Sequence, residues 1–297
     1  MSEAGAGAQD WRRFSPEELA RQYSPRGTVN NLDALLQDYR TQSQPMYDLP
    51  HLRDLRYGPQ ADELLDLFPV PGRTDAPLFV FIHGGYWRAL GKQDSVFMAR
   101  NFTAHGVAVA AVNYQLAPAA RLSEIVAQCR RSLAWLYTHG PAHGIDVRRI
   151  VLGGSSAGAH LAALVGVTNG HRELEGEVGE HRDQSSAVQA IVSFYGASNL
   201  ETILAQSTPY GLGVRIPALQ LLLRGQPADQ PALARLASPV AHVGPGDPPL
   251  LLLHGDQDPQ MPVAQSLELL GAYERAGLPV RFVPLHGAKH GGREFYD

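Results

Sequence analysis

Apolar residues along this chain of 297 residues gather in short continuous runs rather than in strict alternation with polar ones. Such runs are typical of strands that a sheet buries on both faces. The runs expected to form strands cover residues 77–82, 107–114, 149–153, 190–195, 250–253 and 280–285. Two earlier segments, 52–57 and 64–70, are predicted to form a hairpin at one edge of the sheet, with its turn at 57–60.

Between these runs, apolar residues recur at the spacing of an amphipathic helix. The clearest case is 123–139, where Ile125, Val126, Cys129 and Leu133 share one face. Further helices are expected over residues 94–105, 159–167 and 263–276. Strands that alternate with helices predict an α/β fold, in which a mostly parallel central sheet is flanked by helices on both faces.

Two segments depart from this alternation. Residues 1–50 are interpreted as an N-terminal tail and helical arm, with helices expected at 14–19 and 29–43, and residues 51–297 as the main domain. Residues 199–243 are long and rich in proline, and we interpret them as a small helical cap inserted in that domain. A single crossover helix with long loops is the alternative. The distinction matters because loops at the carboxyl ends of parallel strands build binding sites.

Composition narrows the classes of function. Residues are 44% hydrophobic and 18% charged, which suits one large globular domain. No apolar run approaches the roughly 20 residues of a membrane span, and a net charge of −4 gives no basis for nucleic-acid binding. The N-terminus lacks the apolar core of a secretion signal, and the single cysteine, Cys129, fits a core position and a reducing cytoplasm. We therefore expect a cytoplasmic protein with a small-molecule partner, either as a monomer or as a homodimer.

Twelve histidines raise the question of a metal site. None of them lies in the His-Glu-x-x-His spacing of a zinc enzyme, and no Cys-x-x-Cys pair is present. We therefore expect neither a metal nor another cofactor.

A candidate nucleophile lies in the run Gly154-Ser155-Ser156-Ala157-Gly158. It follows a short apolar strand and precedes a helix-prone run, which is the context of a nucleophile elbow. Ser156 is the predicted nucleophile, since it alone has glycine two residues before and two residues after it. An ordinary turn that opens a helix would show the same pattern, so the partners of this serine decide its interpretation.

The expected partners follow in the chain order serine, acid, histidine. Asp258 comes after the strand at 250–253 and is the predicted acid, whereas Asp256 is so close to the strand that we expect it to organise the turn. His290, in a glycine-rich loop beyond the last strand, is the predicted base in preference to His286. Either histidine could instead lie on the surface of that loop.

A glycine-rich turn, His83-Gly84-Gly85-Tyr86, ends the strand at 77–82. Backbone N–H groups of Gly84, Gly85 and Tyr86, together with that of Ala157, are the predicted oxyanion hole. Tyr86, Trp87 and Ser155 are the predicted substrate-binding residues. For the two aromatic residues, packing beneath the site is an equal alternative.

From residue 52 onward the chain resembles the α/β-hydrolase superfamily, and more narrowly its kynurenine formamidase (arylformamidase) branch among the esterases and lipases. The resemblance rests on these motifs: His83-Gly84-Gly85-Tyr86-Trp87-Arg88, Asn113-Tyr114-Gln115-Leu116-Ala117-Pro118, Ser156-Ala157-Gly158-Ala159-His160-Leu161 and His254-Gly255-Asp256-Gln257-Asp258. It implies the catalytic triad Ser156, Asp258 and His290, the oxyanion loop Gly84, Gly85 and Tyr86, and hydrolysis of a formyl amide of an arylamine, of the N-formylkynurenine type, in tryptophan catabolism.

The chain departs from that branch at two places. Ser155 stands where members commonly carry histidine, which bears on the substrate rather than on the chemistry. Seven residues follow His290, whereas the fold usually ends in a helix after the catalytic histidine. We expect either that the native reading frame is longer or that this chain lacks that helix.

Two alternatives to the formamidase stay open. A carboxylesterase for small acyl esters would use the same residues. A non-catalytic binding protein of the same fold is the remote alternative, because such proteins usually lose a member of the triad.

Overall fold

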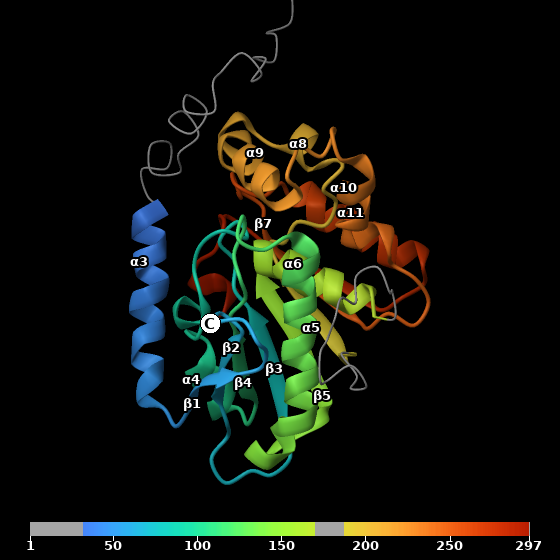
Figure 1. Ribbon diagram of the computed structural model, residues 1–297. Helices are drawn as coiled ribbons and strands as arrows, with labels where there is room; N and C mark the ends of the chain where they lie inside the picture. Colours follow the sequence, from blue (N-terminus) through green and yellow to red (C-terminus); the bar gives the residue numbers. More distant parts are fainter. Residues whose placement is uncertain (1–31, 170–186, 297) are drawn as a thin grey trace, which may run out of the picture.

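The computed structural model describes residues 32–169 and 187–296 (Figure 1). The helix expected at 14–19 lies outside the described residues. The helix expected at 29–43 is present as α3 (Leu32–Ser43), and a 3₁₀ turn, Gln44–Asp48, follows it. In Figure 1, α3 stands along one flank of the molecule.

The described strands form one eight-stranded sheet. In chain order they are β1 (Leu52–Arg56), β2 (Leu64–Phe68), β3 (Ala76–Ile82), β4 (Ala108–Val112), β5 (Ile145–Ser155), β6 (Ala190–Phe194), β7 (Leu250–Gly255) and β8 (Val280–Leu285). Their order in the sheet is β1-β2-β4-β3-β5-β6-β7-β8. Only β1 with β2 and β2 with β4 pair antiparallel, and the other pairs are parallel. The predicted mostly parallel sheet with a hairpin at one edge is confirmed.

The sheet carries a separate hydrophobic core on each face, as the continuous apolar runs require. Along β3, Leu78, Val80 and Ile82 enter the larger core, whereas Phe79 and Phe81 enter the other. The larger core also takes side chains from α5 (Leu122–His139), α6 (Ala157–Val167) and α11 (Val263–Arg275). The second takes α4 (Ala99–Ala104) and Phe295, which follows the sheet in a 3₁₀ turn, Arg293–Phe295. The expected layering, helix–sheet–helix, is thus confirmed.

The helix expected at 94–105 is shorter, because its first residues are held in other contacts. Residues Lys92–Asp94 form a 3₁₀ turn, and the helix begins only at Ala99. The ammonium group of Lys92 is buried between the carboxylates of Asp54 and Asp66, at 2.7 Å from each. Asp94 binds the guanidinium of Arg40 on α3 at 2.8 Å, so this turn fastens the N-terminal arm to the sheet.

The segment between β6 and β7 contains several short helices rather than one crossover helix. They are α8 (Ile203–Gln206), α9 (Pro209–Leu223), α10 (Pro231–Leu236) and a 3₁₀ turn, Pro239–Ala241. Figure 1 shows α8, α9 and α10 together at one end of the molecule, beyond the ends of the strands. Buried leucines of α9 join the larger core, so this cap is packed onto the domain.

None of the helices in the two described ranges combines the length and the apolar character that crossing a membrane requires.

Candidate active site

Ser156 lies in the tight turn between β5 and α6. Its backbone has φ 54° and ψ −117°, a strained conformation for a non-glycine residue, and its side chain lines a cavity. A Cβ atom at Gly158 would lie 2.1 Å from the carbonyl oxygen of Ile82, and one at Gly154 would lie 2.5 Å from that of Gly158. Both neighbours must therefore be glycine for the turn to pack against β3, as the motif predicts.

His290 reaches this serine from the loop that follows β8. Its Nε2 is 3.0 Å from Ser156 Oγ, and its Nδ1 is 2.6 Å from Asp258 Oδ2. An ionised carboxylate only accepts hydrogen bonds, so Nδ1 carries the proton and Nε2 is free to accept from the serine hydroxyl. Ring centroids of His290 and Tyr195 lie 4.6 Å apart, which fixes the plane of the imidazole.

Asp258 is buried at the end of the turn after β7. Its Oδ1 accepts from the backbone N–H groups of Gln260 and Met261 at 2.7 and 2.8 Å. Its Oδ2 accepts from Nδ1 of His290, and Nε2 of His254 lies 3.3 Å from the same oxygen. Burial alone raises the pKa of Asp258, but the charge of His290 and these hydrogen bonds outweigh it and hold the pKa below its ordinary value. The carboxylate is therefore ionised and can orient His290.

The alternative pair is also formed, but on the surface. Asp256 Oδ2 lies 2.9 Å from Nδ1 of His286, whose side chain is 85% exposed, and Asp256 Oδ1 accepts from the N–H of Gly287. The hydrogen bond from His286 is the main cause that lowers the pKa of Asp256. This pair joins the loop after β7 to the loop after β8, and neither member lines the cavity at Ser156.

The glycine-rich turn after β3 lies against the serine. A Cβ atom at Gly84 would lie 2.7 Å from the carbonyl oxygen of Ser155, and one at Gly85, where φ is 104°, would lie 2.2 Å from that of Ala89. Gly84, Gly85 and Tyr86 all line the cavity that Ser156 lines. Ala157 is the first residue of α6, where helix geometry leaves the N–H without an intrahelical partner. The predicted oxyanion residues are thus placed around Ser156.

The cavity at Ser156 is small, with a volume of about 50 Å³. Its walls come from segments far apart in the chain: Tyr39, Gly84, Gly85, Tyr86, Leu90, Ser155, Ser156, Tyr195, Gln260 and His290. One water molecule needs roughly 10–15 Å³ of such space, so only a few heavy atoms fit beside the serine. Ser155 lies in the wall, as expected, and its hydroxyl bonds Tyr296.

The two aromatic residues of the turn take different places. The Tyr86 ring lines the cavity, and its hydroxyl donates to Gln260 Oε1 at 2.5 Å. Trp87 is 2% exposed and packs beneath the site, where its Nε1 donates to His160 Nδ1 at 3.2 Å. Of the two alternatives for Trp87, the structure therefore has it packed beneath the site and not lining the cavity. Its indole N–H finds the buried imidazole acceptor below the turn, and its ring enters the core.

His160 belongs to the motif that begins at Ser156, and the structure gives it a supporting role that the sequence did not indicate. On α6, one turn after Ser156, its Nε2 donates to the carbonyl of Ala237 at 2.7 Å while its Nδ1 accepts from Trp87. Burial lowers the pKa of His160 to about 4, so the ring is neutral at pH 7. This one side chain joins the elbow, the oxyanion turn and the loop after α10.

Other residues of the site also lacked a local signal in the sequence. Tyr39 comes from the N-terminal arm, and its hydroxyl lies 3.3 Å from that of Tyr195. His254 supports Asp258, and its own Nδ1 lies 2.7 Å from Ser266 Oγ. Tyr39 lies within the helix expected at 29–43, where nothing in the sequence indicated a contact with Ser156, and the position of His254 in a motif at a strand end was the one hint of its role.

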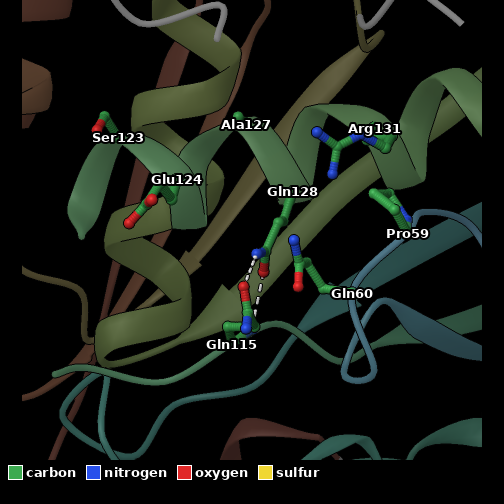
Figure 2. A pocket seen from close by; sticks show the side chains of 8 residues that line it. All are labelled: Pro59, Gln60, Gln115, Ser123, Glu124, Ala127, Gln128 and Arg131. Atoms are coloured by element: carbon green, nitrogen blue, oxygen red, sulfur yellow. Dashed lines mark hydrogen bonds between the residues drawn. The ribbon is translucent and has the colours of Figure 1, made fainter. Parts of the chain in front are cut away.

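A second, polar cavity of about 290 Å³ lies beside α5 (Figure 2). It is lined by Pro59, Gln60, Gln115, Ser123, Glu124, Ala127, Gln128 and Arg131. Gln128 accepts from the backbone N–H of Gln115 at 2.8 Å and donates to its Oε1 at 2.6 Å, as Figure 2 shows. No lining residue is shared with the cavity at Ser156, so we assign this cavity no part in the chemistry there.

Comparison with known families agrees with this geometry. The BD-FAE family matches residues 65–273, which is more than half of the chain and includes Ser156 and Asp258. The chain belongs to the BD-FAE family. The family match places the chain in the α/β-hydrolase superfamily, as the motifs predict. Its strand order and its solved structural neighbours show the corresponding fold.

Curated relatives of this BD-FAE chain carry two kinds of name. It is 31% identical to "Esterase LipQ" of Mycobacterium tuberculosis over 81% of this chain and 58% of that protein. It is 35% identical to "Kynurenine formamidase" of Danio rerio over 52% of this chain and 55% of that protein. The chain thus spans little more than half the length of these relatives. Among solved structures it resembles a truncated carbohydrate esterase from gut microbiota, with a TM-score of 0.75, 24% identity and coverage of 81% of this chain and 89% of that one.

Proposed function

We propose that this protein is a serine hydrolase that transfers a small acyl group from an amide or ester to water. The observation that carries the proposal is the continuous line of hydrogen bonds from Asp258 through His290 to Ser156, which ends at a small cavity. Nucleophile, base and orienting acid in this arrangement are the parts that acyl transfer by an acyl-enzyme requires.

Each residue then has a chemical role. His290 Nε2 takes the proton of Ser156 as Oγ attacks the carbonyl carbon, and the oxyanion is held by N–H groups near Gly85, Tyr86 and Ala157. One such donor typically contributes about 3 kcal/mol. His290 then protonates the leaving amine or alcohol, and a water that the same imidazole activates releases the acid.

The size of the cavity favours the smallest acyl groups. A formyl group occupies less space than any other acyl group, and about 50 Å³ bounded by Tyr39, Tyr86 and Tyr195 suits it. We therefore propose an N-formyl-arylamine, of the N-formylkynurenine type, as the first substrate class. The similarity to the formamidase of Danio rerio supports this proposal.

A carboxylesterase for small acyl esters is the second candidate. It is favoured by the longer match to the esterase of M. tuberculosis, which extends over 81% of this chain against 52% for the formamidase. Acetyl esters would use the same serine, base and oxyanion donors, so the two candidates differ in the size of the acyl group and in the leaving group.

A side-by-side rate measurement on N-formyl-L-kynurenine and p-nitrophenyl acetate separates the two. We expect a kcat/KM for the formamide at least tenfold above that for the ester. Ester hydrolysis without detectable deformylation would replace the formamidase by the carboxylesterase, with Ser155 as the first residue to exchange. No turnover of either substrate would contradict hydrolysis of small acyl groups.

A further inference from the structure

A buried cation lies in the cap beside the active-site loop. Arg215, on α9, is 3% exposed. Among the described residues, the guanidinium donates a hydrogen bond to Ser207 Oγ, and no carboxylate lies within ion-pair distance of it. Removing a guanidinium from water without a counter-ion is costly, so natural proteins seldom keep such a group without a use for it.

The position of Arg215 connects the cap with the catalytic acid. Arg215 Nη1 and the carbonyl oxygens of Gln260 and Pro259 all lie within 3.2 to 3.4 Å of one point beside Gly211, where a Cβ atom of that residue would sit. Gln260 lines the cavity at Ser156. The guanidinium is therefore next to the loop that carries Asp258 and Gln260.

Neither of the two acidic groups near Arg215 neutralises it. Burial lowers the pKa of Arg215 to about 10, while the nearby Tyr86 and Asp258 act in the opposite direction. The oxygens of Asp258 are already engaged by His290, His254 and two backbone N–H groups. The Tyr86 hydroxyl donates to Gln260. The guanidinium thus stays charged at neutral pH, with donors left for a further acceptor.

We propose that Arg215 is a specificity-determining residue that binds an anionic group, a carboxylate, on the leaving-group part of the substrate. The guanidinium presents a rigid fork of N–H donors that matches a carboxylate. The acyl cavity has room for a few atoms only, so the part of the substrate that extends toward the cap is the leaving group. This inference rests on the proposed acyl transfer at Ser156 and names the substrate class of that site.

The test compares acetyl esters that differ only in charge. The substrates are 4-acetoxybenzoate and its neutral amide, 4-acetoxybenzamide, each with the wild-type protein, Arg215→Met and Arg215→Lys. We expect the wild type to prefer the benzoate, and Arg215→Met to lose at least tenfold of that preference, mainly through KM. Arg215→Lys should retain part of it. The readout is the benzoate-to-benzamide ratio of kcat/KM in each protein, so a change in turnover common to both substrates cancels.

Two results would overturn the assignment of Arg215. One is an equal loss with both substrates, which a structural role predicts. The other is a wild-type protein that hydrolyses the benzamide and the benzoate equally well. If wild type hydrolyses neither ester nor N-formyl-L-kynurenine, it is the proposed acyl transfer that fails.

A second measurement uses the wild-type protein alone and so does not depend on the folding of a variant. We expect 4-hydroxybenzoate to inhibit hydrolysis of p-nitrophenyl acetate at least tenfold more tightly than 4-hydroxybenzamide at low salt. Equal inhibition constants for the two would contradict an anion site in the cap.

Discussion

At the scale of single residues, two aspartates close together in the chain compete for the role of catalytic acid, and their spacing in the sequence does not decide between them. Asp256 and Asp258 are two positions apart, and each binds a histidine of the loop after β8. Only the Asp258–His290 pair is buried and reaches Ser156. The sequence favoured this pair through the glycines around His290. It could not show that the other pair would form as well.

The two pairs provide a matched mutational test. Asp258→Asn should lower kcat/KM by about 10³- to 10⁴-fold, because His290 loses the acceptor that fixes its reactive tautomer. Asp256→Asn removes an exposed pair and should change kcat/KM less than threefold. Steady-state kinetics on p-nitrophenyl acetate measures both variants. The reverse order of effects would assign the acid to Asp256.

At the scale of elements, the N-terminal arm and the cap complete a site whose reactive groups come from the sheet. The motifs at strand ends predicted Ser156, Asp258, His290 and the glycine turn from local sequence. Tyr39 reaches the cavity from α3, and α9 brings Arg215 beside the loop that carries Asp258. No local pattern reports which helix face meets a distant loop. These contributions could be found only in the folded chain.

The arm should set the size of the acyl group. Tyr39 lines the cavity, and its ring stacks on Phe97 with centroids 5.4 Å apart. Tyr39→Ala removes that wall, so we expect the ratio of kcat/KM for p-nitrophenyl butyrate over acetate to rise at least tenfold. Tyr39→Phe keeps the ring and should leave the ratio within threefold of wild type. An unchanged acyl-length profile in Tyr39→Ala would show that the arm does not bound the acyl site.

At the scale of the whole molecule, the alternation of apolar runs and helical patterns predicted the layers and the parallel sheet. The sequence placed the start of β5 too late. Residues 145–148 extend this strand ahead of the apolar run: Ile145 and Val147 pack on the larger core, while Asp146 pairs with Arg148 and Arg149. Apolar and charged residues alternate in this segment, so it does not continue the apolar run that marked the strand. The short α4 has a different cause, since ionic contacts of Lys92 and Asp94 replace its first turn.

Buried neutral histidines make the stability of the molecule depend on pH. His160 titrates at about 4 when folded, against an ordinary pKa of 6.5. The unfolded chain therefore binds more protons between these values, and stability is complete above pH 6.5 and is lost as the pH falls toward 4. At pH 4.5 this one group should cost roughly 2 to 3 kcal/mol of the free energy of unfolding.

Replacing His160 isolates its contribution to the loss of stability at low pH. Another buried histidine, His83, whose pKa burial lowers to about 4, remains in every protein compared. His160→Gln cannot titrate but keeps a donor for the Ala237 carbonyl. We expect its loss of stability between pH 7 and pH 4.5, from urea unfolding, to be smaller than that of wild type by about 2 kcal/mol. His286→Gln, at an exposed position, should match wild type. Equal losses in His160→Gln and wild type would show that His160 does not titrate in this window.

The central claim is that Ser156 is the nucleophile of an acyl transfer, and covalent labelling tests it most directly. The protein is treated with a fluorophosphonate, and intact-mass and peptide analysis follow, with Ser156→Ala and Ser155→Ala in parallel. We predict one label per chain, on Ser156, in wild type and Ser155→Ala. Ser156→Ala should carry no label and should have lost at least 10⁴-fold in kcat on p-nitrophenyl acetate. A Ser156→Ala protein that still hydrolyses the ester, or a label on another residue, would contradict the account.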